Sequence, residues 1–167
     1  MFDIGEYVVH PGQGVCKIDR IDSEPAEVYV LLPVGDRHST HISFPVASQG
    51  RLRPILSEKE AQSLIDLWPE MATDPYTDRS LALEEEHFKK QIRLGTCEDC
   101  VRVVKTFMER IEQAQSINKK PPVAYERILK EARSRSLTEL SVALGTTVED
   151  VRSRFEGIDR VVPAEEA

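Results

Sequence analysis

The chain has 167 residues, is 40% hydrophobic and 31% charged, and carries a net charge of −7. This length suffices for one or two small domains with modest cores, and the composition excludes a disordered or low-complexity chain. No apolar run approaches the length of a membrane-spanning helix, and the first residues lead into strand-like sequence without a signal peptide. Three cysteines, an odd number, argue against a disulfide framework and fit a reducing compartment. We therefore expect a cytoplasmic protein.

The chain opens with a pattern typical of short strands and tight turns. Pro11-Gly-Gln-Gly14 separates two runs that are rich in β-branched and aromatic residues. Similar runs follow, flanked by Gly or Pro, and the five candidate strands cover residues 7–9, 15–21, 27–32, 41–44 and 51–53. We therefore predict an α+β protein whose residues 1–56 form a small five-stranded Tudor- or SH3-like β-barrel, which avoids exposed edges by near-closure.

After Pro54 the spacing of apolar residues changes from two to three or four, which indicates helices. Ser57-Glu-Lys-Glu60 is a capping box that opens a short helix, and a proline stops that helix directly after Trp68. We predict that residues 57–77 are a connecting helix and linker, with Trp68 filling the seam between two domains. Residues 78–160 are predicted to form an all-α bundle of four or five antiparallel helices, followed by an acidic tail at 161–167.

Capping residues mark the first two helices of this bundle. Asp78 or Ser80 can cap a helix that Gly95 is expected to end in the left-handed conformation. Thr96 then caps a second helix, which runs to about Ile117 and has an apolar stripe at helical spacing.

The remaining helices are marked by proline, glycine and threonine. Pro121-Pro122 start a third helix. Ser136-Leu-Thr-Glu139 has the pattern of another capping box and predicts a short helix that ends at Gly145, and Thr147 opens the last helix.

The first residues also carry a family likeness. Met1-Phe-Asp-Ile-Gly-Glu-Tyr-Val-Val-His-Pro-Gly-Gln-Gly-Val-Cys-Lys-Ile18 resembles the opening of the CarD/CdnL family of bacterial transcription regulators. The same RNA-polymerase-interacting domain occurs in the transcription-repair coupling factor and binds the polymerase β subunit. The resemblance extends to about residue 145 and is strongest in the first twenty residues, in 95–110 and in 139–145. It implies a regulator that is not an enzyme, needs no cofactor, metal or small-molecule substrate, and modulates promoter open-complex stability through its helical domain.

The resemblance implies that a strand edge of the barrel binds the polymerase β subunit by adding the partner's strand. Two family arginines, one after the second strand and one before the hydrophobic-Pro pair of the fourth, correspond here to Glu24 and Ser43. The positions assigned to polymerase binding are Glu24, Tyr29, His41, Ser43 and Phe44.

The resemblance also implies contact with promoter DNA by the helical domain, without strong sequence specificity. Residues 88–135 contain twelve Lys and Arg against six Asp and Glu, a local excess of +6 in a chain that is otherwise acidic. Such a basic face can meet phosphates, although solvated helix faces explain the same pattern. The family wedges a tryptophan into the transcription bubble, but the matching segment 80–88 has none, and Tyr76 is the nearest aromatic substitute. The candidate DNA-binding residues are Tyr76, Lys89, Lys90, Arg93, Lys119, Lys120, Arg127 and Lys130.

Two other readings of the sequence remain open. Residues 140–151 resemble a helix-turn-helix fragment. The protein would then be a regulator that binds operator DNA and uses its barrel as a sensor domain. The residues placed towards the major groove would be Glu149, Asp150, Arg152 and Ser153. Cys97-Glu-Asp-Cys100 at a helix start fits a thiol oxidoreductase, since a helix N-terminus lowers a thiol pKa. Core packing of Cys100 explains the same motif, and no further cysteine or histidine pair completes a zinc site.

Overall fold

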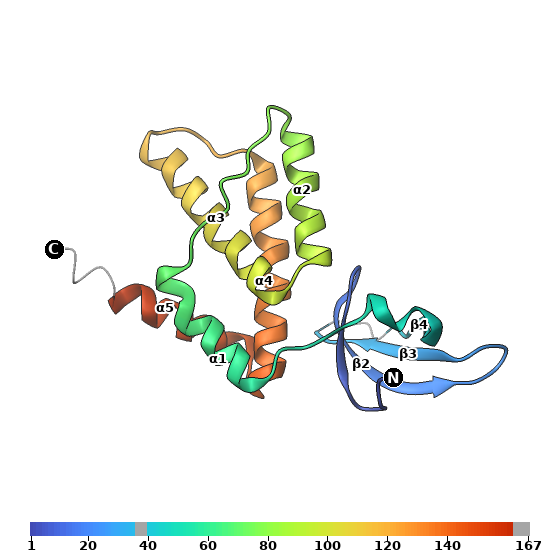
Figure 1. Cartoon of the computed structure of the whole chain (residues 1–167). Coiled ribbons are helices and arrows are strands. Elements are labelled where there is room, and N and C mark those ends of the chain that lie inside the picture. The colour runs from blue at the N-terminus through green and yellow to red at the C-terminus, as the bar shows by residue number, and fades with distance from the viewer. Residues whose placement is uncertain (36–39, 162–167) are drawn as a thin grey trace. The chain divides into compact units, whose positions relative to one another are not determined.

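The computed structural model describes residues 1–35 and 40–161, with side chains to residue 158 (Figure 1). The chain forms two compact units, residues 1–56 and residues 57 onwards. Residues 162–167 of the predicted acidic tail lie outside the described part of the chain. Within the described residues, no helix has the length and apolar character needed to cross a bilayer.

The first unit is an antiparallel five-stranded sheet in the order β4-β3-β2-β1-β5. Its strands are β1 (Tyr7–His10), β2 (Gly14–Asp22), β3 (Val28–Pro33), β4 (Ile42–Pro45) and β5 (Arg53–Pro54). The prediction of a five-stranded N-terminal sheet followed by helices is confirmed, but the expected near-closure is wrong. The 3-10 helix η1 (Val46–Arg51) connects β4 to β5, and these two strands are the outer members of the sheet instead of pairing with each other.

The core of this unit follows the two-residue period of the strands. Alternate side chains from all the longer strands meet in one buried cluster: Val8, Cys16, Ile18, Tyr29, Leu31, Phe44, Val46 and Leu52. The hydroxyl of Tyr29 accepts a hydrogen bond from the Phe2 amide at 3.0 Å and donates one to Gln49 Oε1 at 2.9 Å. A buried phenol needs such partners, so Tyr29 ties the chain start and η1 to the sheet.

The second unit is built around one long helix. Its elements are α1 (Glu58–Leu67), η2 (Trp68–Glu70), α2 (Leu81–Leu94), α3 (Cys97–Ser116), α4 (Val123–Leu144) and α5 (Val148–Val161). Helix α4 contacts α1, α2, α3 and α5 (Figure 1). A chain of edge-to-face rings joins α2, α3 and α4, from Phe88 to Phe107 and on to Tyr125.

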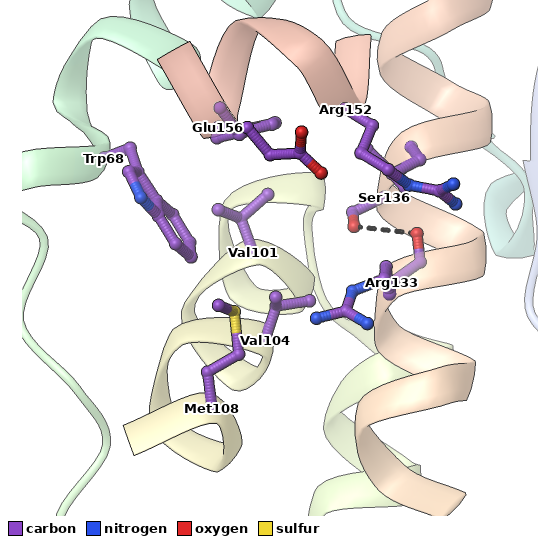
Figure 2. Close-up of a pocket in the computed structure, with 10 residues that line it drawn as sticks. Trp68, Val101, Val104, Met108, Arg133, Ser136, Arg152 and Glu156 are labelled. Atoms are coloured by element: carbon purple, nitrogen blue, oxygen red, sulfur yellow. Dashed lines mark hydrogen bonds between the residues drawn. The ribbon is translucent and has the colours of Figure 1, made fainter. Parts of the chain in front are cut away.

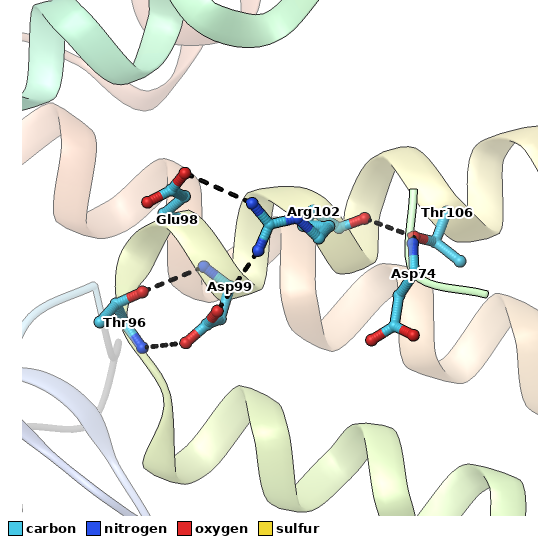
Figure 3. A network of polar contacts seen from close by, with 6 residues as sticks. All are labelled: Asp74, Thr96, Glu98, Asp99, Arg102 and Thr106. Atoms are coloured by element: carbon cyan, nitrogen blue, oxygen red, sulfur yellow. Dashed lines mark hydrogen bonds and ion pairs between the residues drawn. The ribbon is translucent and has the colours of Figure 1, made fainter. Parts of the chain in front are cut away.

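The predicted caps of three helices are confirmed. Ser57 and Glu60 form a reciprocal capping box at α1, and Ser80 accepts from the Leu83 amide at the start of α2. Thr96 and Asp99 form a second capping box at α3, which Figure 3 shows beside the Glu98–Arg102 ion pair. Side-chain oxygens thus satisfy amides that have no partner within the helix.

The prediction of a separate helix starting at Ser136 is wrong. Residues 136–139 lie inside α4, which runs without a break from Val123 to Leu144. The Ser136 hydroxyl is buried and donates to the Ala132 carbonyl at 2.8 Å instead of capping a helix start. A serine in the middle of a helix commonly donates its hydroxyl to the carbonyl one turn earlier, so the capping pattern at Ser136 did not mark a helix start.

The two glycines expected to end helices do so for different reasons. Gly145 ends a helix as predicted: it has the left-handed φ of +64° and separates α4 from α5. Gly95 was expected to be left-handed, but it is extended with φ −84°. A Cβ there would lie 2.5 Å from the Gln91 carbonyl oxygen and 2.7 Å from Asp99 Oδ2, so close approach requires glycine.

Trp68, which the sequence predicted at a seam between domains, belongs to the helical unit. Its ring is buried inside the helical unit, edge-to-face with Phe155 of α5 at 5.2 Å. Lys105 of α3 donates to the Trp68 carbonyl at 2.6 Å. Since α1 also packs against α4, the residues predicted as a connecting helix are part of this unit.

The irregular segment before α2 is held by α3. Arg110 donates to the carbonyl oxygens of Asp74 and Tyr76 at 3.0 and 2.6 Å, and to Glu84 Oε1 at 2.6 Å. Thr106 accepts from the Asp74 amide at 2.9 Å, as Figure 3 shows. The segment predicted as a linker is therefore pinned by side chains of a buried helix face.

Candidate functional site

The outer edge of β4 exposes backbone groups that can pair with another strand. Val46 donates its amide to Glu27, which faces it across the β3–β4 ladder. Hydrogen-bonded pairs alternate along an antiparallel ladder, so Phe44 and Ile42 also point their backbone groups to β3. Ser43 must then point its N–H and C=O outward. Within the described residues no strand covers this edge.

The opposite edge, β5, is closed by its residue types. The Ile18 amide of β2 donates to the Glu6 carbonyl, so the backbone groups of Glu6 point towards β2. Because this direction alternates along the strand, the backbone groups of Val9 point the other way, towards its β5 partner Arg53. Pro54 therefore occupies the outward position, and it has no N–H to offer. Its carbonyl oxygen accepts a hydrogen bond from Arg53 Nη1 at 3.3 Å. Pro45 likewise lacks an N–H at the other outward position of β4, so among the described residues of the two outer strands Ser43 is the outward residue that offers both a donor and an acceptor. In this sense β4 is the open edge of the sheet and β5 the blocked one.

Three of the residues predicted to bind the polymerase are exposed. Ser43 lies on β4 itself, with its side chain in solvent. His41 precedes β4, and its Nε2 lies 3.3 Å from Asp19 Oδ2 of β2. Glu24 is exposed in the turn between β2 and β3. The two positions at which the resemblance implies arginines thus hold an exposed acid, Glu24, and an exposed neutral hydroxyl, Ser43.

The other two residues predicted for this contact are core residues. Tyr29 is fully buried, and its hydroxyl is satisfied within the unit. Phe44 is 6% exposed and packs edge-to-face against His10, with ring centroids 5.4 Å apart. Their side chains do not reach a partner, because the alternation of β4 turns Phe44 to the core and Ser43 to solvent.

The first unit of the chain matches a known protein family. The family model of the CarD-like/TRCF RID domain matches residues 2–56. Residues 2–56 are a CarD-like/TRCF RID domain. The match to this RNA-polymerase-interacting domain supports a transcription-related role and an RNA polymerase partner. A search of the curated proteins found no match to the chain. The helical unit lies outside the match to the RID domain.

The aromatic candidate of the helical unit is held in place by its neighbours. Tyr76 stacks on His87 with ring centroids 3.7 Å apart, and its hydroxyl lies 3.2 Å from Asp78 Oδ2. Desolvation, and then the hydrogen bond to Asp78, raise the pKa of Tyr76 above its usual value. One face of the ring is therefore already covered, and an acid lies next to its polar end.

Two of the predicted DNA-binding cations are paired with the same acid. Arg127 of α4 donates to both carboxylate oxygens of Glu85 at 3.0 and 3.1 Å, and Lys89 lies 3.0 Å from it. The Arg127 hydrogen bond, followed by that of Lys89, lowers the pKa of Glu85 to about 2. Glu85 thus compensates part of the charge of these two cations, and its ion pair with Arg127 ties α2 to α4.

The remaining basic candidates are exposed but do not form a single group. Lys90 and Arg93 lie on the C-terminal half of α2, and Lys130 lies on the exposed side of α4. Lys119 and Lys120 lie in the α3–α4 connection, at the end of the bundle where α4 begins (Figure 1). Throughout the described residues, no ion pair involves any of these five side chains.

The structure has the order of elements that the helix-turn-helix interpretation requires: α4, Gly145 and then α5. Two charged side chains in the first half of α5, those of Asp150 and Arg154, are however hydrogen-bonded within the protein. Asp150 accepts from Thr146 at 3.0 Å and from Arg154 at 3.0 Å. Arg154 also donates to Gln62 of α1 at 3.3 Å. Arg152 and Glu149 are exposed.

The two cysteines of the Cys97-Glu-Asp-Cys100 motif are core residues. Cys97 and Cys100 are 1% and 4% exposed, and their thiols point at the carbonyls of Ser136 and Ile92. A thiol that exchanges disulfides must be reached by its substrate, so this burial does not fit the oxidoreductase reading. In the described chain, no group of three or more His, Cys, Asp or Glu side chains is placed to hold a metal ion.

Proposed function

We propose that the protein is a non-enzymatic regulator of transcription that binds the β subunit of RNA polymerase through its RID domain. The docking element in this proposal is the outer edge of β4, to which the polymerase adds a strand by backbone hydrogen bonds. The observation that carries the proposal is the contrast between the edges of the sheet. Ser43 offers an outward N–H and C=O, whereas Pro54 blocks the corresponding position of β5.

The exposed charges around β4 indicate how this contact differs from the family pattern. Glu24 and Ser43 stand where the resemblance implies two arginines, and Asp19 lies beside His41. Backbone pairing does not depend on these charges, so it can persist while electrostatic attraction is lost. We therefore expect an interface of low salt sensitivity.

Proline substitution separates backbone pairing from side-chain contact. Ser43→Pro removes the outward N–H and leaves the β3–β4 hydrogen bonds in place, as Pro45 already does at the next outward position. In a pull-down of the purified polymerase β lobe by the full chain, we expect at least a tenfold loss of binding for Ser43→Pro.

The matched control is Ser43→Ala, which changes the side chain and keeps the backbone donor. It should bind the β lobe like the unsubstituted chain, and circular dichroism checks that both variants fold. Equal binding by a folded Ser43→Pro variant would exclude β4 as the docking edge. Absence of binding by the unsubstituted chain at low salt would remove the polymerase β proposal itself.

We propose in addition that the helical unit touches promoter DNA near the transcription bubble and shifts the balance between closed and open complexes. Its exposed cations, Lys90, Arg93 and Lys130 on the helices and Lys119 and Lys120 in the α3–α4 connection, are the residues proposed to meet phosphates. A difference of about 1.4 kcal/mol in affinity for the two states shifts their populations tenfold, so a few weak contacts suffice. The protein then acts in the bacterial cytoplasm, without a cofactor.

The lifetime of polymerase–promoter open complexes tests this second part. The triple variant Lys90→Gln, Arg93→Gln, Lys130→Gln should change that lifetime less than the unsubstituted protein does. Its DNA affinity should also show a shallower salt dependence, by about 0.9 in the log–log slope for each phosphate that the variant no longer neutralises. Lys59→Gln on the exposed side of α1, which removes one positive charge away from the proposed DNA-binding residues, is the control; it is compared with each of the three single substitutions. Identical lifetimes and slopes for the triple variant and the unsubstituted protein would refute the assignment.

A further inference from the structure

The helical unit contains a cavity of about 190 Å³ that the polymerase and DNA surfaces do not use. It lies between α3, α4, α5 and η2, as Figure 2 shows. Its inner wall consists of buried apolar side chains, among them Trp68, Val101, Val104 and Leu137. Met108, at 37% exposure, lies at the side that faces solvent.

The size and lining of the cavity favour a small apolar group. An apolar cavity of about 150 Å³ in another protein holds benzene, so this one has room for an aromatic ring with a short substituent. The one hydroxyl in the wall, that of Ser136, is already donated to the carbonyls of Ala132 and Arg133. The inner wall therefore offers packing to a ligand and no polar group that would hold water tightly.

The mouth of the cavity carries an excess of positive charge. Arg133 of α4 and Arg152 of α5 both line it, with Glu156 as the single acid (Figure 2). In the described part of the chain, no carboxylate lies within ion-pair distance of either guanidinium group. Guanidinium groups bind carboxylates through two parallel hydrogen bonds, whereas an amine would be repelled.

We propose that this cavity binds a small monocarboxylate with an aromatic or short aliphatic body. The body packs between Trp68 and the valines of α3, and the carboxylate meets Arg133 and Arg152. Such a ligand touches α3, α4, α5 and η2 together, so it stabilises the folded helical unit by mass action. This inference is independent of the proposed contact with the polymerase.

Trp68 makes the site directly testable, because it is the single tryptophan of the chain and lines the cavity. Phenylacetate added to the full chain should change the Trp68 fluorescence in a saturable way and raise the melting temperature. Benzylamine, which has the same ring and the opposite charge, is the matched probe and should do neither. No saturable change with phenylacetate up to millimolar concentration, or equal binding of both probes, would overturn the proposal.

Two variants separate the charge from the cavity. Arg133→Met with Arg152→Met should weaken phenylacetate binding by about 10- to 100-fold, the loss expected for charge-assisted hydrogen bonds. Val104→Phe fills the cavity and should abolish binding. Circular dichroism establishes that each variant is folded; should one not fold, the phenylacetate and benzylamine titrations of the unsubstituted chain still decide the question. Unchanged affinity in a folded variant of either kind would contradict the assignment.

Discussion

Replacing Arg110 with methionine should destabilise the helical unit more than any surface substitution. Arg110 of α3 holds Glu84 of α2 and the carbonyls of Asp74 and Tyr76 in one network. Its guanidinium group also lies over the rings of Phe88 and Phe107, at 5.3 and 5.0 Å from their centroids. Methionine keeps much of the apolar contact and removes the charge and all the hydrogen bonds, so the substitution isolates the polar network.

The size of the effect follows from burial. The side chains of Glu84 and Arg110 are 4% and 15% exposed, so neither charge can recover its hydration when the partner is removed. Breaking a buried ion pair from one side costs about 3–5 kcal/mol, because the remaining charge stays buried without compensation. Small domains are stable by about 5–15 kcal/mol, so Arg110→Met should remove a large share of the stability of this unit.

Urea unfolding followed by Trp68 fluorescence measures this loss, since Trp68 lies within the same unit. Glu84→Gln removes the charge of the partner, and the double variant Glu84→Gln, Arg110→Met completes a cycle. The double variant should be less destabilised than the two single variants added together, with a coupling of about 1–3 kcal/mol. A loss below about 1 kcal/mol for Arg110→Met, or additive single losses, would refute this account of the network.

Three further predictions concern an ion pair, the glycines of α4 and α5, and the buried thiols. Arg127 and Lys89 lower the pKa of Glu85 from an ordinary 4.5 to about 2. The ion pairs should therefore stabilise the fold fully above a pH of about 4.5, and this stabilisation should be lost as the pH falls through about 2. Urea unfolding should show Glu85→Gln less stable than the unsubstituted chain at neutral pH, by under about 1 kcal/mol since Arg127 is exposed, with the difference vanishing near pH 2. Gly145→Ala should lower the melting temperature, at a cost of about 1 kcal/mol, because alanine rarely adopts the φ of +64° found there. Gly157→Ala within α5 should raise the melting temperature, because a Cβ there meets no other atom. A change of melting temperature in the same direction for both variants would contradict this account. The thiols of Cys97 and Cys100 should react with a thiol reagent only as the unit unfolds, and rapid reaction of the native protein would reopen the oxidoreductase reading.

Local patterns predicted the structure well where neighbouring residues decide it. The predicted capping box at Ser57 and the predicted cap at Thr96 are both present, and each involves residues three positions apart. The same kind of pattern failed at Ser136, because packing of α4 against its neighbours extends the helix through it. A short polar pattern therefore marks a helix start only where tertiary contacts do not favour continuation.

In the candidate site too, the sequence predicted the strands and turns but not which side chains face the core. The order of strands and turns in residues 1–56 was sufficient for the five-stranded sheet, which the structure confirms, and for the likeness to the RID domain, which the family match confirms. Two of the residues assigned to the partner surface, Tyr29 and Phe44, have their side chains in the core of the sheet. Nothing in their local sequence distinguishes an aromatic side chain on the core face from one on the exposed face until the register of the strand is known.

The sequence by itself determined the local features of this protein: where strands give way to helices, which residues cap the helices, and which family the first 56 residues resemble. These features depend on contacts between residues close together in the chain. Only the tertiary structure decided which sheet edge stays open, that Arg127 is paired with Glu85, and where a cavity remains beside Trp68. Each of these depends on groups tens of residues apart, whose meeting is set by the packing of whole elements.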